Sequence, residues 1–130
     1  DGSWGFVGGQ KYSYAVPIAG TEDDRLYQSE HYWANGGSYI VDVPNGTYRL
    51  TLKFAEIYTG AYAGSRRFSV RAEDAFVITS LDVFFTAGGR YIALDREFII
   101  EVTDGQLNLD FIEEQGSPKV NAIAVESVAP

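Results

Sequence analysis

Hydrophobic and polar residues alternate along three stretches of the chain. From Tyr48 to Phe54 every second residue is apolar, and polar residues stand between them. A similar alternation runs from Phe98 to Val102 and from Leu107 to Phe111. Successive side chains of a β-strand point to opposite faces, so this period of two predicts strands that place one face on a core.

Two turn signals join these predicted strands. Asn45-Gly46 separates Tyr39–Val43 from Thr47–Ala55, and Asp104-Gly105 separates the two later stretches. Asn-Gly and Asp-Gly pairs favour the tight turns of β-hairpins, so we predict two hairpins. Further strands are predicted over Arg66–Arg71, Ala75–Ser80 and Val120–Val128, and a short helical turn within Leu81–Ala87.

Turn-forming residues recur at short intervals, as at Gly8-Gly9, Gly36-Gly37 and Gly88-Gly89, and no segment keeps a helical period. The composition agrees, because 14 glycines and 15% aromatic residues are typical of β proteins. A chain of 130 residues is one domain by length and can bury a substantial core. We therefore predict a single all-β domain over residues 1–130, either a sandwich or a barrel.

The charge of the chain narrows the choice of partner. Its 18 acidic and 10 basic residues give a formal net charge of −8. Such a charge repels phosphate backbones and anionic lipids, so we expect neither a nucleic-acid partner nor a membrane partner. In addition, no apolar run approaches the roughly 20 residues that a helix needs to cross a bilayer.

The metal-ligating residues are few. The chain has no cysteine and one histidine, His31, which excludes thiolate and histidine-cluster metal centres. The run Glu22-Asp23-Asp24 offers the oxygen ligands that calcium takes, but it lacks the ligand spacing of an EF-hand. Thr21 followed by three acids also fits a capped turn. We expect no cofactor and no metal centre.

Catalysis by carboxylates is the enzymatic alternative. Cleavage of a glycosidic bond needs only two acids, and Glu56 is the best placed because it ends a predicted strand before an irregular loop. However, eighteen acids produce such pairs by chance, and no nucleophile motif accompanies His31. We expect a protein that is not an enzyme, with a small glycosidase as the alternative.

Aromatic residues gather outside the predicted strands, in segments rich in glycine. A sugar ring has an apolar face of C–H groups and a rim of hydroxyls, which suit an aromatic ring and its polar neighbours. The alternative is ordinary packing of these rings beneath loops. The aromatic residues concerned are Trp4, Phe6, Tyr12, Tyr14, Tyr32, Trp33, Tyr58, Tyr62 and Tyr91.

A series of short strings resembles the malectin domain and its bacterial relatives, the family 57 carbohydrate-binding modules. The resemblance covers about Pro17 to Val125, with the strings in family order, and the most specific string is Lys-Phe-Ala-Glu-Ile-Tyr, which ends at Tyr58. The strings are Leu26–Tyr32, Val43–Tyr48, Leu52–Tyr58, Arg67–Val70, Leu81–Phe84, Asp104–Leu107 and Pro118–Ile123.

This resemblance implies a jelly-roll-like antiparallel β-sandwich and a non-catalytic sugar-binding module, often appended to a glycoside hydrolase. Tyr58 matches an aromatic binding position of the family, Tyr12 matches another, and Trp4 stands near a third. Two positions depart from the family pattern. Thr59 replaces a loop aromatic, for which Tyr62 could substitute, and Gly116 stands where malectin has a binding acid.

We therefore expect a secreted module that binds glucan chains, with plant cell-wall β-glucans such as mixed-linkage glucan or xyloglucan favoured. The expected partners are a polysaccharide or oligosaccharide and a covalently linked catalytic domain. The alternatives are α-glucan or glucose-disaccharide binding, as in malectin, and a structural or protein-interaction domain. The candidate carbohydrate-binding residues are Trp4, Tyr12, Trp33, Tyr58 and Tyr62 for stacking, and Glu30, Asn35, Glu56 and Arg90 for hydrogen bonds to hydroxyls.

Overall fold

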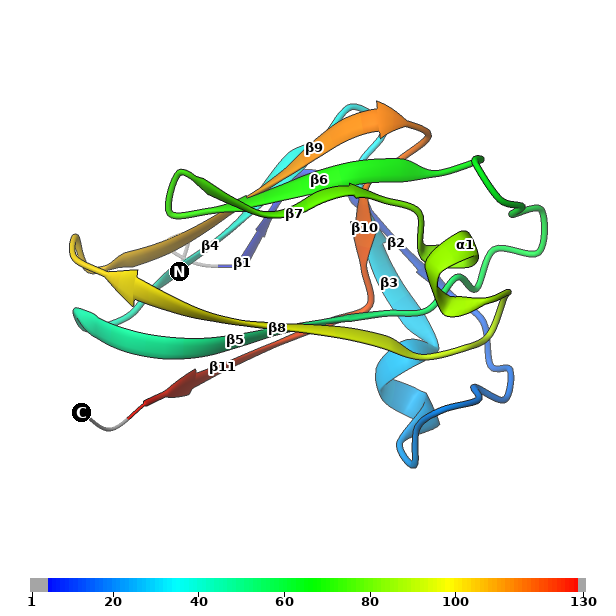
Figure 1. Cartoon of the computed structure of the whole chain (residues 1–130), viewed down its shortest axis with the longest axis horizontal. Coiled ribbons are helices and arrows are strands. Elements are labelled where there is room, and N and C mark those ends of the chain that lie inside the picture. The colour runs from blue at the N-terminus through cyan, green and yellow to red at the C-terminus, as the bar shows by residue number, and fades with distance from the viewer. Residues whose placement is uncertain (1–4, 129–130) are drawn as a thin grey trace.

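Two β-sheets face each other in the computed structural model, which describes residues 5–128, and a smaller third sheet lies at one end (Figure 1). The larger sheet has the strand order β1-β4-β9-β6-β7, the facing sheet β11-β5-β8, and the small sheet β10-β3-β2. The strands are β1 (Gly5–Val7), β2 (Gln10–Ser13), β3 (Ser29–Tyr32), β4 (Gly37–Asp42), β5 (Gly46–Phe54), β6 (Arg67–Ala72), β7 (Ala75–Leu81), β8 (Leu94–Val102), β9 (Gln106–Gln115), β10 (Lys119–Val120) and β11 (Ala122–Ser127).

All strand pairs within these sheets are antiparallel, so the predicted all-β antiparallel sandwich is confirmed. The described residues also contain one 3-10 helix, η1 (Asp24–Tyr27), and one short α-helix, α1 (Val83–Ala87). The helix confirms the predicted turn within Leu81–Ala87: the Asp82 carboxylate caps it by accepting from the Phe85 N–H. Neither described helix is long and apolar enough to cross a membrane.

The core lies between the two large sheets, and the predicted alternation defines it. Leu50, Leu52 and Phe54 of β5 are completely buried, whereas the residues between them lie at the other face of the sheet. Opposite β5, the larger sheet supplies buried residues of β6 and β9. These are Phe68, Val70, Leu107, Leu109 and Phe111.

The strands on either side of the two turn signals do not pair, so both predicted hairpins are wrong. β4 pairs with β9, and β5 pairs with β8, which places the two arms of each predicted hairpin in opposite sheets. Each connection, β4 to β5 and β8 to β9, therefore passes from one sheet to the other, and we call it an arch. A strand with one buried face satisfies the period of two in a hairpin and in an arch alike, so the alternation could not choose between them.

The two arches lie at the same end of the sandwich and are bonded to each other. The Val43 N–H donates to the Gly105 carbonyl over 3.1 Å, and the Gly105 N–H donates to Asn45 Oδ1 over 2.6 Å. The turn residues that suggested hairpins thus hold one arch against the other.

This contact leads to a stability prediction. Replacing Asn45 with alanine should lower the free energy of unfolding by about 0.5–1.5 kcal/mol, because the Gly105 N–H loses its acceptor. Asn45→Asp keeps a side-chain oxygen at the same place and should retain most of the stability. Urea denaturation followed by circular dichroism measures both; equal losses in the two variants would contradict the role assigned to this bond.

The hairpin that does form carries no glycine or asparagine at its turn. β6 and β7 pair as neighbours, and Glu73 and Asp74 between them have φ values of 49° and 69°. Both residues adopt the left-handed region, which glycine and asparagine usually occupy in such turns. The Asn108 N–H donates to the Glu73 carboxylate over 2.6 Å and so helps to hold the turn.

The small sheet lies at the opposite end of the sandwich from the arches (Figure 1). β3 is its central strand, between β10 and β2. After β5 leaves the core, Ala55 and Ile57 remain buried, and the chain then passes beside the small sheet in the loop from Tyr58 to Arg66. The fold thus brings this loop and the small sheet together at one end of the molecule.

Candidate functional site

An open groove of about 480 Å³ lies where the small sheet meets the loop from Tyr58 to Arg66. β2 and β3 form one side, the loop forms another, and the turn between β9 and β10 completes it. We call it the tyrosine groove. Its lining residues are Tyr12, Glu30, Tyr32, Tyr58, Gly60, Tyr62, Ser65, Arg66, Gly116 and Ser117.

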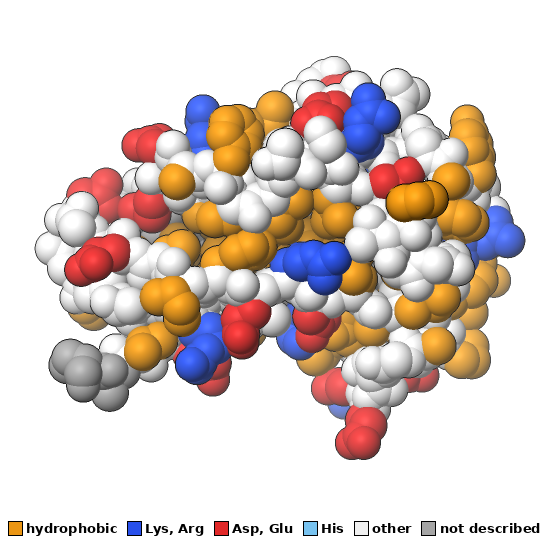
Figure 2. Space-filling model, in the orientation of Figure 1, with side chains coloured by type: hydrophobic (Ala, Val, Ile, Leu, Met, Phe, Trp, Pro, Cys, Tyr) orange, Lys and Arg blue, Asp and Glu red, His pale blue; other side chains and the backbone are white. Residues whose placement is uncertain are grey.

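Four tyrosines give the groove its aromatic character. Tyr58 and Tyr62 are the outer pair, with 53% and 65% of their surface exposed. Tyr12 and Tyr32 lie deeper and are half-buried on adjacent strands. Figure 2 shows hydrophobic side chains, a class that includes tyrosine, gathered at this end of the molecule. The groove thus offers several flat rings together with their hydroxyl groups.

The Tyr12 hydroxyl can donate a hydrogen bond to a ligand. Burial, and next the carboxylate of its cross-strand neighbour Glu30, raise the pKa of Tyr12 above its usual value. A tyrosine with its usual pKa is already protonated at neutral pH, so this shift leaves the hydroxyl a donor.

Hydrogen bonds from Arg90 and within the loop hold the segment that carries the outer tyrosines. The Arg90 Nη1 group donates to the Thr59 carbonyl over 2.7 Å and to the Ala61 carbonyl over 3.4 Å. The Tyr62 N–H donates to Ser65 Oγ over 3.1 Å. Gly60 leaves room for the Tyr58 ring, because a Cβ at this position would come within 2.8 Å of it and the ring would have to shift. These contacts fix the loop before any ligand arrives.

A buried ionic network forms the floor of the groove. Lys119 is completely buried, and its ammonium group donates to Glu30 Oε1 over 2.5 Å and to the Ala55 carbonyl. The Glu56 carboxylate lies 3.9 Å from the same nitrogen and forms a two-pronged pair with Arg66, at 2.7 and 3.1 Å. Burial lowers the pKa of Lys119, and the two carboxylates oppose that shift. Two cations therefore balance two anions.

The network also ties the walls of the groove together. The Arg66 Nη1 group donates to the Ser117 carbonyl over 2.5 Å, which joins the tyrosine loop to the turn before β10. Lys119 belongs to β10, and Glu30 belongs to β3. Each wall therefore contributes at least one group to the same cluster of charges.

Four of the predicted site residues come together in this groove: Tyr12, Glu30, Tyr58 and Tyr62. Two others lie behind it. Glu56 is buried with both carboxylate oxygens bonded to Arg66, and Arg90 holds the loop without lining the groove. This arrangement gives no support to a glycosidase that relies on Glu56, because neither of its oxygens faces the groove.

The structure does not place Trp33 or Asn35 in the tyrosine groove. Trp33 is 2% exposed, its ring stacks on Phe111, and its indole N–H donates to the Val7 carbonyl over 2.8 Å. It is a core residue and offers no ring face to a sugar. Asn35 lines two other hollows, one of them over β4, β9 and β6 of the larger sheet. Trp4 lies outside the described residues.

Sequence reasoning did not select Tyr32, Ser65, Arg66 or Ser117 as site residues. For Tyr32 a signal was present, because side chains two positions apart on a strand share a face. Glu30 and Tyr32 both line the groove, whereas His31 and Trp33 point away from it and pack near the Phe6 ring. Once Glu30 was selected as a site residue, the alternation along the strand should have added Tyr32 to the site and removed Trp33 from it.

The acidic run near η1 forms a turn held by hydrogen bonds. The Asp23 N–H donates to Thr21 Oγ1 over 3.0 Å, and the Ile18 N–H donates to Asp24 Oδ2 over 3.2 Å. Within residues 5–128, no group of three or more histidine, cysteine, aspartate or glutamate side chains is placed to hold a metal ion.

A family model described as the malectin domain matches residues 5–125 of this chain. The chain belongs to the malectin domain family. The malectin domain is a carbohydrate-binding domain rather than a catalytic one. The family resemblance seen in the sequence is thereby confirmed.

Curated malectins extend beyond the region that they share with this chain. Malectin-A of Xenopus laevis is 36% identical over 103 residues, which are 75% of this chain and 36% of that protein. Malectin of Homo sapiens is 34% identical over 101 residues, which are 75% of this chain and 34% of that protein. The chain thus spans about a third of the length of these relatives.

Solved structures with the same fold are parts of larger proteins. The Bacteroides uniformis β-glucuronidase matches with a TM-score of 0.87 and 24% identity, covering 98% of this chain and 15% of that one. The extracellular domain of ANXUR2 from Arabidopsis thaliana matches with a TM-score of 0.83 and 16% identity, covering 98% of this chain and 41% of that one. At these identities the likeness is one of fold.

Proposed function

We propose that this malectin domain binds a glucan chain in the tyrosine groove. One observation carries the proposal: Tyr58 and Tyr62 expose 53% and 65% of their surface on a braced loop at the rim of an open groove. Exposed aromatic rings that gather at a concave surface are typical of ligand-binding sites. The coarser function of the family, carbohydrate binding, supports a sugar as that ligand.

The chemistry of the groove suits a chain of glucose units. Equatorial hydroxyls leave both faces of a glucosyl ring lined with C–H groups, which can stack on the rings of Tyr58 and Tyr62. Hydroxyl oxygens of the sugar can accept from Tyr12 and from Arg66 at the groove floor. A few such contacts give an affinity in the micromolar to millimolar range.

Among glucans we favour the β-linked chains of plant cell walls. An extended β-linked chain presents flat faces along its length and can lie along an open groove. The α-linked alternative is a glucose disaccharide, as in malectin, held by Tyr12 and Tyr58, the two residues that match aromatic binding positions of the family. The two alternatives differ in the linkage and in the length of chain that the groove holds.

We further propose that the domain belongs to a larger secreted protein, where it is linked to a catalytic domain. The structural neighbours support this, since one is part of a β-glucuronidase and another is part of an extracellular domain. In such a protein the domain would hold the enzyme on its polysaccharide. The full-length parent protein should therefore lose activity on an insoluble glucan, and keep it on a soluble one, when the groove is disabled.

Native affinity electrophoresis tests the proposed ligand. We expect gels that contain barley β-glucan, xyloglucan or hydroxyethylcellulose to retard the domain, and gels that contain xylan to leave its mobility unchanged. Retardation by starch or pullulan alone would select the α-linked alternative. If no polysaccharide retards the domain, the glucan proposal fails and a protein-interaction role replaces it.

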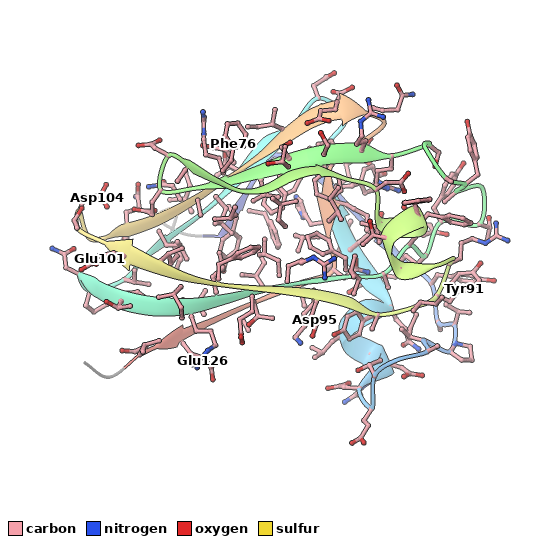
Figure 3. The ribbon with its side chains drawn as sticks, in the orientation of Figure 1. Phe76, Tyr91, Asp95, Glu101, Asp104 and Glu126 are labelled. Carbon is pink, nitrogen blue, oxygen red and sulfur yellow. The ribbon has the colours of Figure 1, made fainter. Side chains whose placement is uncertain are left out.

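Tyr58→Ala should weaken binding to the retarding glucan by at least about 1 kcal/mol, because an exposed stacking ring is lost. Phe76→Ala is the matched control. Phe76 is 59% exposed on β7 and lies toward the Asp104 turn, away from the groove (Figure 3). Isothermal titration calorimetry should find the control unchanged. Equal affinities of Tyr58→Ala and the unmodified domain would remove Tyr58 from the site.

A further inference from the structure

The two charged side chains that line the tyrosine groove are paired with buried residues of opposite charge. Among the described lining residues two are charged, Glu30 and Arg66. Glu30 is bonded to Lys119, and Arg66 is bonded through two nitrogens to Glu56. Both charged lining residues therefore have a partner of opposite charge. The lining presents polar groups, and its net charge is balanced by the buried network.

Arg66 retains hydrogen-bond donors although its charge is compensated. Its guanidinium has five N–H groups. Three of them reach Glu56 and Ser117 within the described structure, and the side chain is 12% exposed at the floor of the groove. The remaining two N–H groups suit neutral oxygen acceptors, such as neighbouring hydroxyls of a sugar.

The Arg90 guanidinium lies outside the groove lining. Its Nη1 group is directed at the Thr59 and Ala61 carbonyls, so this group is occupied by the loop rather than offered to a ligand. A carboxylate that entered the groove would lose water and meet the Glu30 carboxylate, and no unpaired cation among the described lining residues would receive it. Burial of a charge without a partner is strongly unfavourable.

We infer that the tyrosine groove selects neutral sugar chains and rejects chains that carry uronic acids. The inference rests on the proposed function and adds the class of ligand to it. The buried network beneath the groove has a specific role in this selectivity. It holds the Glu30 and Arg66 side chains in place, and Lys119 and Glu56 balance their charges. A site for uronates would instead need a cation that is not already paired.

Matched polysaccharides provide the test. Barley β-glucan, xyloglucan and pullulan would each be compared with the same preparation after oxidation of its C6 hydroxymethyl groups to carboxylates. Isothermal titration calorimetry of the unmodified domain at 150 mM salt should show at least about tenfold weaker binding of the oxidised form of whichever glucan is bound. Equal or tighter binding of the oxidised form would overturn the selectivity and leave glucan binding intact. Failure to bind any neutral glucan would overturn both.

Two variants link the selectivity to the network. Glu30→Gln leaves Lys119 with Glu56, at 3.9 Å, as its nearest counter-charge and gives the cluster a net positive charge. Its ratio of affinities, neutral over oxidised, should fall at least about threefold. If this variant does not fold, Ser117→Lys serves instead, because it adds a cation to the groove wall and keeps the carbonyl that accepts from Arg66.

Glu97→Gln is the matched control for net charge. Glu97 belongs to β8, and its exposed side chain pairs with Arg49 over 3.5 Å on the outside of the sandwich. The substitution changes the charge of the chain as much as Glu30→Gln does, but far from the groove. The affinity ratio should stay at the value of the unmodified domain. An equal fall in both variants would assign the effect to overall charge and overturn the role of the network.

Discussion

Replacing Lys119 with methionine should lower the free energy of unfolding by about 3–5 kcal/mol, one of the largest effects that a single substitution can have here. The ammonium group is completely buried and faces the carboxylates of Glu30 and Glu56. Methionine fills similar space but removes the charge, so Glu30, which is 4% exposed, loses its counter-ion with little water to replace it. Denaturation by urea, followed by circular dichroism, measures the loss.

Lys53→Met is the matched control for this prediction. Lys53 pairs with Asp95 at 2.9 Å, but the two side chains are 21% and 44% exposed. Water already solvates much of this pair, so its removal should cost no more than about 1 kcal/mol. If the two methionine variants lose the same stability, the buried network contributes no more than an ordinary surface pair.

Truncation of Leu52 to alanine should lower the free energy of unfolding by about 2–5 kcal/mol. Leu52 is completely buried in the middle of β5, and its side chain packs in the core between the two large sheets. Alanine removes its contacts and leaves a cavity that rigid strands on both sides cannot close. The same urea titration gives the value.

Ile99→Ala provides the comparison for Leu52. Ile99 lies on the adjacent strand, β8, as the antiparallel partner of Arg49, and it is 60% exposed. Because its side chain is largely in water, the loss should stay within about 0.5 kcal/mol. Similar losses at the two positions would mean that the alternation along β5 and β8 does not separate core from surface.

Most strands of the two facing sheets could be predicted from the sequence, but their partners could not, and β1, β2 and β3 were not predicted at all. The alternation from Tyr48 to Phe54 identified a half-buried strand and its buried face correctly. The turn pairs at Asn45-Gly46 and Asp104-Gly105 then suggested hairpins, because nearby turns are the usual reason for such residues. Pairing between sheets depends on contacts remote in sequence, and no local pattern contains them.

Only part of the candidate site could be predicted, because the sequence shows residue types but not the direction in which each side chain points. Tyr58 and Tyr12, which both line the groove, were selected because of the family resemblance, and for Tyr58 the string Lys-Phe-Ala-Glu-Ile-Tyr carries it. Trp33 was chosen for its ring and its glycine-rich neighbourhood, although the strand before it turns that side chain into the core. A tryptophan suits a core and a sugar site equally, and the direction of its side chain decides between them.

The ionic floor of the groove could not be foreseen. Lysine is almost never fully buried, so nothing about Lys119 in the sequence marked it as an interior residue. Its partners Glu30 and Glu56 stand far from it along the chain, and three different segments must assemble before the charges meet. The two acids were predicted as site residues for their hydrogen-bonding capacity. In the structure they act mainly by holding the groove in shape.

The paired arches determine how this domain can be made in the cell. β4 needs β9 as its partner, and β5 needs β8, so the first half of the chain has few contacts to form by itself. A ribosome adds residues one after another, and the early strands must wait in an open state until β9 has been synthesised. Long-range pairing of this kind folds slowly. During that delay the apolar faces of β4 and β5 stay exposed to water, and an unfinished chain in this state is prone to aggregate.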